Sequence, residues 1–230
     1  ENLLDFYNSQ GYRNAVIVRD STYAINDKRI GIDIQLEEGD KFYIRNVSWV
    51  GNSQYSTELL QAMLGIEKGD TYDKKTLHKR LGIQRETDIE DMSQISSLYQ
   101  NNGYLMSMIE PSEIVVGNDS IDLEIKIFEG RPFTINNVDI SGNLRVDDEV
   151  IRREIYTRPG ELYNRALLMQ TLRQLAQMQH FDPASIMPQI QPVSNDLVDI
   201  GWPLVETPSD KFEVSGGWGA GMFVGSVGVQ

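Results

Sequence analysis

Two stretches of this chain are near-copies that lie 91 residues apart. The first, residues 42–52, reads Phe-Tyr-Ile-Arg-Asn-Val-Ser-Trp-Val-Gly-Asn, and the second, residues 133–143, reads Phe-Thr-Ile-Asn-Asn-Val-Asp-Ile-Ser-Gly-Asn. In both, apolar and polar residues alternate until Gly-Asn ends the run, which predicts a half-buried strand followed by a turn. A fixed period indicates a repeated structural unit. Arrays of small modules more often present binding surfaces than build one catalytic pocket.

The similarity continues into two helices per copy. Short helices are predicted over residues 57–64 and 148–156, each preceded by a side chain that can cap a helix N-terminus. A second helix is predicted over residues 164–179, because its leucines recur on one face. The matching stretch of the earlier copy, residues 73–102, is longer, so we expect its helix to be extended.

The end of the second helix also recurs. Residues 98–104 of the earlier copy, which contain Gly103, resemble residues 6–12, which contain Gly11. Glycine after a helix adopts the left-handed cap without steric cost. His180 stands near this place in the later copy, so we expect it to occupy the cap with some strain.

Each copy closes with two strands. The final ones, residues 30–36, 121–127 and 198–204, all alternate with period two, as a strand with one buried face does. The unit is therefore strand, helix, helix, strand, strand. The expected domains are the second half of a unit in residues 1–40, complete units in 41–131 and 132–208, and a separate segment in 209–230.

This βααββ unit, with its Gly-Tyr after the second helix and its Phe-x-Ile-x-x-Val opening, resembles the POTRA (polypeptide-transport-associated) domain family. The last copy, with Ile-Arg-Arg-Glu-Ile over residues 151–155 and Pro-Gly-Glu-Leu-Tyr-Asn over 159–164, resembles the barrel-proximal POTRA of BamA-type outer-membrane protein assembly factors. The resemblance implies an α+β fold of tandem modules, each a three-stranded sheet packed by two helices. In that family the last POTRA continues into a membrane β-barrel. Residues 209–230 have the alternation of a barrel strand, so we expect one truncated barrel strand there.

The resemblance also implies a function. Such a chain would be the periplasmic region of a bacterial outer-membrane protein, a non-catalytic scaffold that binds unfolded outer-membrane protein clients and accessory lipoproteins by β-strand addition. It would deliver those clients to the barrel. A related secretion or translocation barrel transporter is an alternative with the same modules. A small periplasmic hydrolase is an alternative from another class.

Strand addition needs a free sheet edge, which offers backbone N–H and C=O groups to an extended guest. The hairpin partner of each final strand is expected to lie at such an edge. In the later copy this stretch, residues 184–190, is interrupted by Pro183, Pro188 and Pro192, which removes donors. The earlier copy is therefore the better candidate, unless its edge is covered or merely solvated. Its predicted docking residues are Tyr104, Leu105, Met106, Ser107, Met108 and Ile109.

Basic residues gather at the start of the longer helix. They are Lys74, Lys75, Lys79 and Arg80. The group is interpreted either as the solvated face of a helix extension or as a contact patch for an acidic partner.

Composition argues against other classes of function. The net charge of −13 is spread along the chain and would repel phosphate backbones, which argues against nucleic acid as a partner. The absence of cysteine removes disulfides, thiolate nucleophiles and Cys-ligated zinc. The two histidines, His78 and His180, stand at unmatched positions, so the sequence predicts no metal site, no cofactor and no catalytic residues. It also contains no apolar run long enough for a transmembrane helix.

Overall fold

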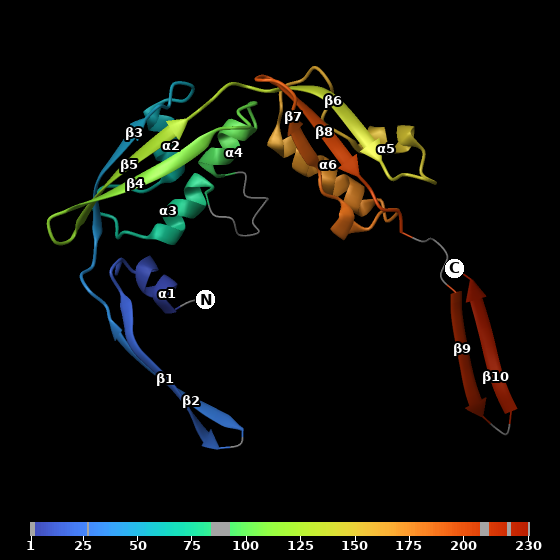
Figure 1. The fold of residues 1–230 in the computed structure, drawn as a ribbon, viewed down its shortest axis with the longest axis horizontal. Helices are drawn as coiled ribbons and strands as arrows, with labels where there is room; N and C mark the ends of the chain where they lie inside the picture. The colour runs from blue at the N-terminus through green and yellow to red at the C-terminus, as the bar shows by residue number, and fades with distance from the viewer. Residues whose placement is uncertain (1–2, 27, 84–92, 208–211, 220–221, 230) are drawn as a thin grey trace. The chain divides into compact units, whose positions relative to one another are not determined.

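The computed structural model describes residues 3–26, 28–83, 93–207, 212–219 and 222–229 (Figure 1). The chain divides into two compact parts, residues 1–131 and 132–230, and each is described by itself. We refer to residues 1–40 as the half module, to 41–131 as the middle module and to 132–208 as the last module.

The middle module is built on a three-stranded sheet. Its order is β3 (Tyr43–Val50), β5 (Ser120–Phe128), β4 (Met108–Val116), with β3 parallel and β4 antiparallel to the central strand. The helices α2 (Thr57–Leu64), α3 (Lys74–Leu81) and α4 (Ile95–Gln100) lie beside this sheet (Figure 1). Among the described strands, β3 and β4 each pair with β5 alone, so both are edges of the sheet, and Tyr43 on β3 also bridges to Thr71.

The core of the middle module follows from the two periodicities of its elements. Alternate residues of β5 are buried, and leucines one helical turn apart on α2 and α3 cover them. Complete burial of each such side chain stabilises the fold by about 1.5–3 kcal/mol. These core residues are Ile121, Leu123, Ile125, Ile127, Leu60, Leu64, Leu77 and Leu81.

The long second helix predicted for the middle module is wrong, because two shorter helices, α3 and α4, stand in its place. Gly82 ends α3 in a left-handed conformation with φ of +78°, and its N–H donates to the carbonyls of His78 and Lys79. A glycine cap of this kind terminates a helix. Part of the predicted extension, residues 84–92, lies outside the described residues.

The last module repeats the arrangement with strand order β6 (Thr134–Ser141), β8 (Leu197–Pro203), β7 (Gln189–Pro192). Its helices are α5 (Asp148–Glu154), α6 (Arg165–Gln177) and the short 3-10 turn η1 (Pro183–Ser185). The predicted α+β fold of tandem modules with three-stranded sheets is thus confirmed, and the middle module carries one helix more than expected.

The strained cap of the last module was assigned to the wrong residue. Gln179, not His180, has a positive φ, of +56°, and it is the only such non-glycine among the described residues. The helix itself ends at Gln177, three residues before His180, just as α4 ends three residues before Gly103, so only the residue with positive φ is shifted.

The half module contains α1 (Leu3–Ser9) and a two-stranded antiparallel sheet of β1 (Val16–Asn26) and β2 (Arg29–Glu37). Strand β2 has the alternation of β5, yet Ile30 and Ile32 are 71% and 58% exposed whereas Ile121 and Leu123 are buried. Within the described residues of the half module, no counterpart of β3 or α2 covers them. Among the described residues, this sequence pattern is therefore buried in the middle module and exposed in the half module.

The C-terminal segment forms a hairpin rather than the single strand predicted. Strands β9 (Phe212–Gly219) and β10 (Met222–Val229) pair antiparallel from Gly219–Met222 to Phe212–Val229. Separately, none of the helices among the described residues is long and apolar enough to span a membrane.

Candidate docking edges

The best-formed free edge of the middle module is β4, which begins four residues later than the predicted docking stretch. Met108 and Ile109 lie in β4, but residues 104–107 form turns. Met108 is exposed and Ile109 is buried in the core. The predicted docking site is therefore corrected to residues 108–116, and its use by a guest stays a prediction.

Residues 104–107 form turns because they complete the end of α4. Gly103 has a φ of +92°, and the N–H of Tyr104 donates to the carbonyl of Tyr99 at 3.1 Å. The Tyr104 ring packs edge-on against that of Tyr99, with centroids 6.0 Å apart. Ser107 then donates its N–H to the Tyr104 carbonyl at 3.1 Å. A chain closed on itself in this way cannot extend until Met108.

The pairing pattern shows which backbone groups of β4 face outward. The N–H of Tyr43 on β3 donates to the carbonyl of Asp119, directly before β5, at 2.8 Å. The backbone N–H and C=O groups of odd-numbered residues in β5 therefore face β3, and those of even-numbered residues face β4. Each odd-numbered residue of β4 lies opposite an odd-numbered residue of β5, as in the pair Pro111–Ile125. In an antiparallel ladder such pairs are not hydrogen-bonded to each other. Ile109, Pro111, Glu113 and Val115 therefore direct their backbone groups away from the sheet.

Pro111 interrupts this row of outward groups, a feature that the sequence interpretation overlooked. Proline supplies no N–H and is tolerated on an edge strand where its nitrogen faces outward. Strand β4 thus offers three outward N–H groups, those of Ile109, Glu113 and Val115, with one gap between the first two. The alternation of inward and outward backbone groups along β4 was the signal from which the missing N–H at Pro111 could have been recognised.

The corresponding edge of the last module is much poorer. Strand β7 has only four residues, and the pair Pro192–Val198 has the same outward orientation as Pro111–Ile125, because the Asp196 carbonyl accepts from Thr134 on β6. Within β7 only Ile190 offers an outward N–H. Proline on a short edge strand protects it against added strands.

The opposite edges, β3 and β6, are partly closed by the same loop in each module. In the middle module, Ile44 on β3 accepts from the N–H of Gly69 at 2.7 Å and donates to the Asp70 carbonyl at 2.8 Å. In the last module, Ile135 on β6 makes the same two bonds with Gly160 and Glu161, at 2.7 and 2.8 Å. The start of each first strand is therefore unavailable to a guest.

A shallow groove of about 480 Å³ lies between α3 and β4. Its walls are Lys74, His78 and Ile83 on the helix side and residues 109–113 on the strand side. Burial, together with the nearby Lys74 ammonium, lowers the pKa of His78, so a neutral imidazole faces the groove at neutral pH. The groove combines apolar side chains with polar and charged ones, and Lys74 is exposed beside the β4 edge.

Glu113 ends this groove and is the most heavily engaged carboxylate of β4. Its Oε1 accepts from the Tyr72 hydroxyl at 2.5 Å, and its Oε2 accepts from Arg13 Nε at 3.0 Å. Burial and the bond to Glu113 raise the pKa of Tyr72, which keeps that hydroxyl a donor. The bond to Glu113 likewise raises the pKa of Arg13. Sequence reasoning did not single out these residues, since only the fold brings them together.

The predicted basic patch divides into two kinds of residue. Lys74, Lys75 and Lys79 are exposed on α3. Arg80 instead donates from Nη1 to the carbonyls of Leu64 and Gly65, at 2.5 and 2.6 Å, and so caps the C-terminal end of α2. A cation at this position is favoured by the helix dipole. Arg80 is therefore removed from the candidate partner patch.

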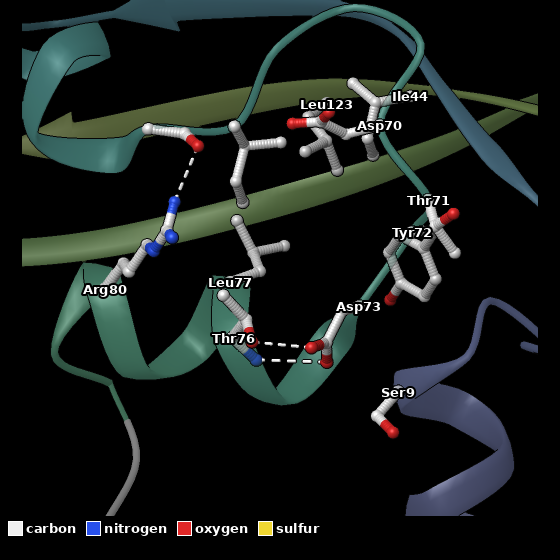
Figure 2. A pocket seen from close by; sticks show the side chains of 12 residues that line it. Ser9, Ile44, Asp70, Thr71, Tyr72, Asp73, Thr76, Leu77, Arg80 and Leu123 are labelled. Atoms are coloured by element: carbon white, nitrogen blue, oxygen red, sulfur yellow. Dashed lines mark hydrogen bonds between the residues drawn. The ribbon is translucent and has the colours of Figure 1, made fainter.

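A cavity of about 280 Å³ lies beside Arg80, at the N-terminal end of α3 (Figure 2). Ser9 on α1 and Thr71 help to line it. Asp73 within it accepts from the N–H of Thr76 at 3.1 Å and from the Thr76 hydroxyl, as the N-terminal cap of α3. Arg80 and Asp73 thus serve helix ends, whereas Asp70, which also lines the cavity, accepts from the N–H of Glu67 at 2.8 Å in the loop after α2.

A glutamate after each final strand anchors the turn that follows the first strand. Glu129 accepts from the N–H of Gln54 at 2.9 Å, from the Tyr99 hydroxyl at 3.0 Å and from Ser53. Burial acts to raise the pKa of Glu129, but these donors outweigh it and hold the pKa below its usual value. In the last module Glu206 accepts from the N–H groups of Arg145 and Val146, and these bonds lower its pKa.

Comparison with known proteins identifies the modules. The POTRA family, described as a surface antigen variable number repeat, matches residues 42–130 and 133–201. The BamA outer membrane protein assembly factor of Neisseria meningitidis serogroup B is 24% identical over 221 residues, which cover 95% of this chain and 26% of that protein. BamA of Neorickettsia risticii is 23% identical over 219 residues, covering 95% and 28%. The chain thus spans about a quarter of the length of these relatives.

The fold agrees with a solved structure. The crystal structure of POTRA domains 3–5 of Haemophilus influenzae BamA superposes with a TM-score of 0.67 at 21% sequence identity, covering 88% of this chain and 77% of that one. The resemblance stated from the sequence is confirmed by the two family matches, which together cover more than half of the chain. This chain belongs to the POTRA family.

Proposed function

We propose that this chain is the periplasmic scaffold of an outer-membrane protein assembly factor, without catalytic activity of its own. The relatives named as assembly factors align over 95% of it. The single observation that supports a binding role is β4, a nine-residue edge strand with three outward N–H groups. Unfolded outer-membrane protein clients contain segments that form β-strands in the folded barrel. Such a segment would add to this edge by backbone hydrogen bonds.

Replacing Val115 with proline tests strand addition directly. Val115 is 45% exposed and its N–H faces outward, so Val115→Pro removes one docking donor without breaking the ladder to β5. A backbone hydrogen bond contributes about 0.5–1.5 kcal/mol, so we expect binding to weaken about two- to tenfold. The measurement is the affinity of the full chain for a fluorescently labelled outer-membrane barrel protein diluted from urea.

The matched control is Val115→Ala, which shortens the side chain and keeps the N–H. Equal affinities of the two variants, both folded by circular dichroism, would contradict strand addition at β4. Weaker binding by the proline variant alone would support it.

We propose that Lys74, Lys75 and Lys79 form a second contact, for an acidic accessory lipoprotein. Three exposed ammonium groups on one short helix stand out in a chain of net charge −13. Such a patch would accelerate association in a salt-dependent way. Changing Lys74 and Lys79 to glutamate should lower the association rate with the accessory protein at low salt, and changing both to glutamine should lower it less. An unchanged rate in both double variants would leave α3 as a solvated face.

We propose further that the hairpin β9–β10 belongs to a membrane β-barrel. Its two strands pair in a regular antiparallel register, and their sequence alternates apolar or small residues with polar ones. In the longer protein, a gel shift between heated and unheated samples would test this proposal, since a closed barrel resists unfolding by detergent. Equal mobility would contradict it.

A further inference from the structure

Arg13 of the half module forms an ion pair with Glu113 on β4. Arg13 lies in the segment between α1 and β1, and its Nε is 3.0 Å from Glu113 Oε2. The Glu113 side chain is 13% exposed and that of Arg13 is 34% exposed, so the pair is partly shielded from water. The contact joins residues 100 positions apart in the sequence.

The backbone around Arg13 is held in place from the middle module. Gly11 accepts a hydrogen bond from the N–H of Phe42 at 2.9 Å. Its φ is +97°, and a Cβ atom there would come within 2.6 Å of the Thr71 methyl group. Only glycine allows this approach. Arg13 therefore reaches Glu113 from a fixed point of attachment.

Glu113 has two roles at the same edge. Its backbone N–H is one of the three that face outward from β4, and its side chain closes one end of the groove beside α3. Tyr72 holds Oε1 from the core, which leaves Oε2 to Arg13. A guest strand would lie about 4.8 Å from β4, with a side chain about 5 Å from that of Glu113. The guanidinium of Arg13 already lies within this distance.

We infer that the half module gates the docking edge: the Arg13–Glu113 pair covers the Glu113 end of β4, and a guest that pairs along the whole strand must displace Arg13. The inference rests on the proposed strand addition and adds its regulation. While the ion pair is formed, a guest can pair only with the Ile109 end of β4, where Pro111 lacks an N–H group. Displacing Arg13 adds the N–H groups of Glu113 and Val115. Guest binding and the contact between the two modules are then coupled negatively, and each weakens the other to the same degree.

Arg13→Ala should therefore tighten the binding of the labelled barrel protein. A partly exposed ion pair contributes up to about 1 kcal/mol, so the expected gain in affinity is about two- to fivefold. Arg19→Ala is the matched control, because Arg19 is an exposed arginine of the same half module and lies in β1. Arg13→Lys, which keeps the charge, should fall between Arg13→Ala and the unmodified chain.

The reciprocal effect is measured without mutating Arg13. The chain has no cysteine, so Asp20→Cys and Lys68→Cys place two spin labels uniquely, one in the half module and one in the middle module. Adding the barrel protein should broaden the distance distribution between the labels. A distribution that does not change at saturating client would overturn the gating.

The outcome for Val115→Pro separates this inference from the function beneath it. If Val115→Pro weakens binding while Arg13→Ala leaves it unchanged or weakens it, the gate is wrong and strand addition stands. If neither variant changes the affinity, both are wrong. Tighter binding by Arg13→Ala together with weaker binding by Val115→Pro supports both.

Discussion

The middle and last modules share one scaffold and differ where a guest could attach. Both place a parallel first strand beside the final strand, close its start with a loop, and anchor the next turn with a glutamate. The middle module has a nine-residue edge strand with a helix, α3, beside it, whereas the edge strand of the last module has four residues and ends in proline. The scaffold thus tolerates edge strands of different length at this edge, because few core contacts depend on the edge strand. Binding can therefore be assigned to one module and withheld from the next.

The largest effect expected is on the shared scaffold. Gly51 and Gly142 have φ of +89° and +88°, and a Cβ at either would meet a carbonyl oxygen, that of Ile127 near the end of β5 or that of Leu204 directly after β8. Replacing either with alanine should destabilise its own module by about 2–4 kcal/mol, since strain and overlap add. Urea unfolding of the chain, followed by hydrogen exchange in each module, would measure the loss.

Two other glycines provide the controls. Gly69 and Gly160 have φ of +96° and +87°, but a Cβ at either meets nothing within 4 Å. Alanine there should cost only the backbone strain, about 1 kcal/mol. Equal losses at Gly51 and Gly69 would show that the close approach to the final strand is not part of the scaffold.

The next effect concerns α3 of the middle module, which begins at the position that matches the start of α6 but ends earlier, at Leu81. Arg80→Met should destabilise the middle module by about 1–2 kcal/mol, because two carbonyls at the end of α2 lose their donor. Lys79→Met on the exposed face should change stability by less than about 0.5 kcal/mol. Thermal unfolding of both variants would decide between a structural and a partner-binding role for Arg80. If the Arg80→Met chain were as stable as the unmodified chain but bound its partner more weakly, Arg80 would belong to the partner-binding patch.

A smaller effect should appear as a dependence of stability on pH. The pKa of Glu129 and that of Glu206 are lower in the folded chain, so their contribution is present above the unfolded pKa and is lost as pH falls through the folded value. Unfolding free energies measured from pH 7 down to about pH 3 should therefore decline below about pH 4.5. Glu129→Gln and Glu206→Gln should each flatten that decline in the module concerned. An unaltered slope in both would mean that other groups control acid unfolding.

The sequence predicted what depends on periodicity and missed what depends on neighbouring elements. The repeat identified the strands, the order of elements and the family, because alternation such as that of residues 121–127 reflects which face is buried. It did not show that Gly82 divides the second helix, since a glycine within a helical pattern can be tolerated or can end it. It placed the docking edge too early, because the turn after Gly103 depends on contacts between Tyr104 and α4.

The residues of the candidate site show the same division. Lys74 and Lys79 were found by composition alone, and they are exposed as a patch requires. Arg80 has the same charge and directly follows Lys79, but it donates to the carbonyl of Leu64 at the C-terminal end of α2, and this contact determines its role. Glu113 and Arg13 are separated by 100 residues, and no local pattern relates them. Contacts of this kind become visible only when the modules are folded.

The smallest effect should come from restoring a single donor at each edge. Pro111→Ala would add an outward N–H to β4 and join its two docking stretches, so client affinity should rise about twofold or more. Pro192→Ala adds an N–H of the same orientation to β7, but that strand is four residues long and Pro188 precedes it, so affinity should not change. Client binding measured on the two single variants therefore compares the two edge strands after the same Pro→Ala substitution. A gain with Pro192→Ala equal to that with Pro111→Ala would mean that strand length does not control docking, and the contrast between the modules would have to be sought elsewhere.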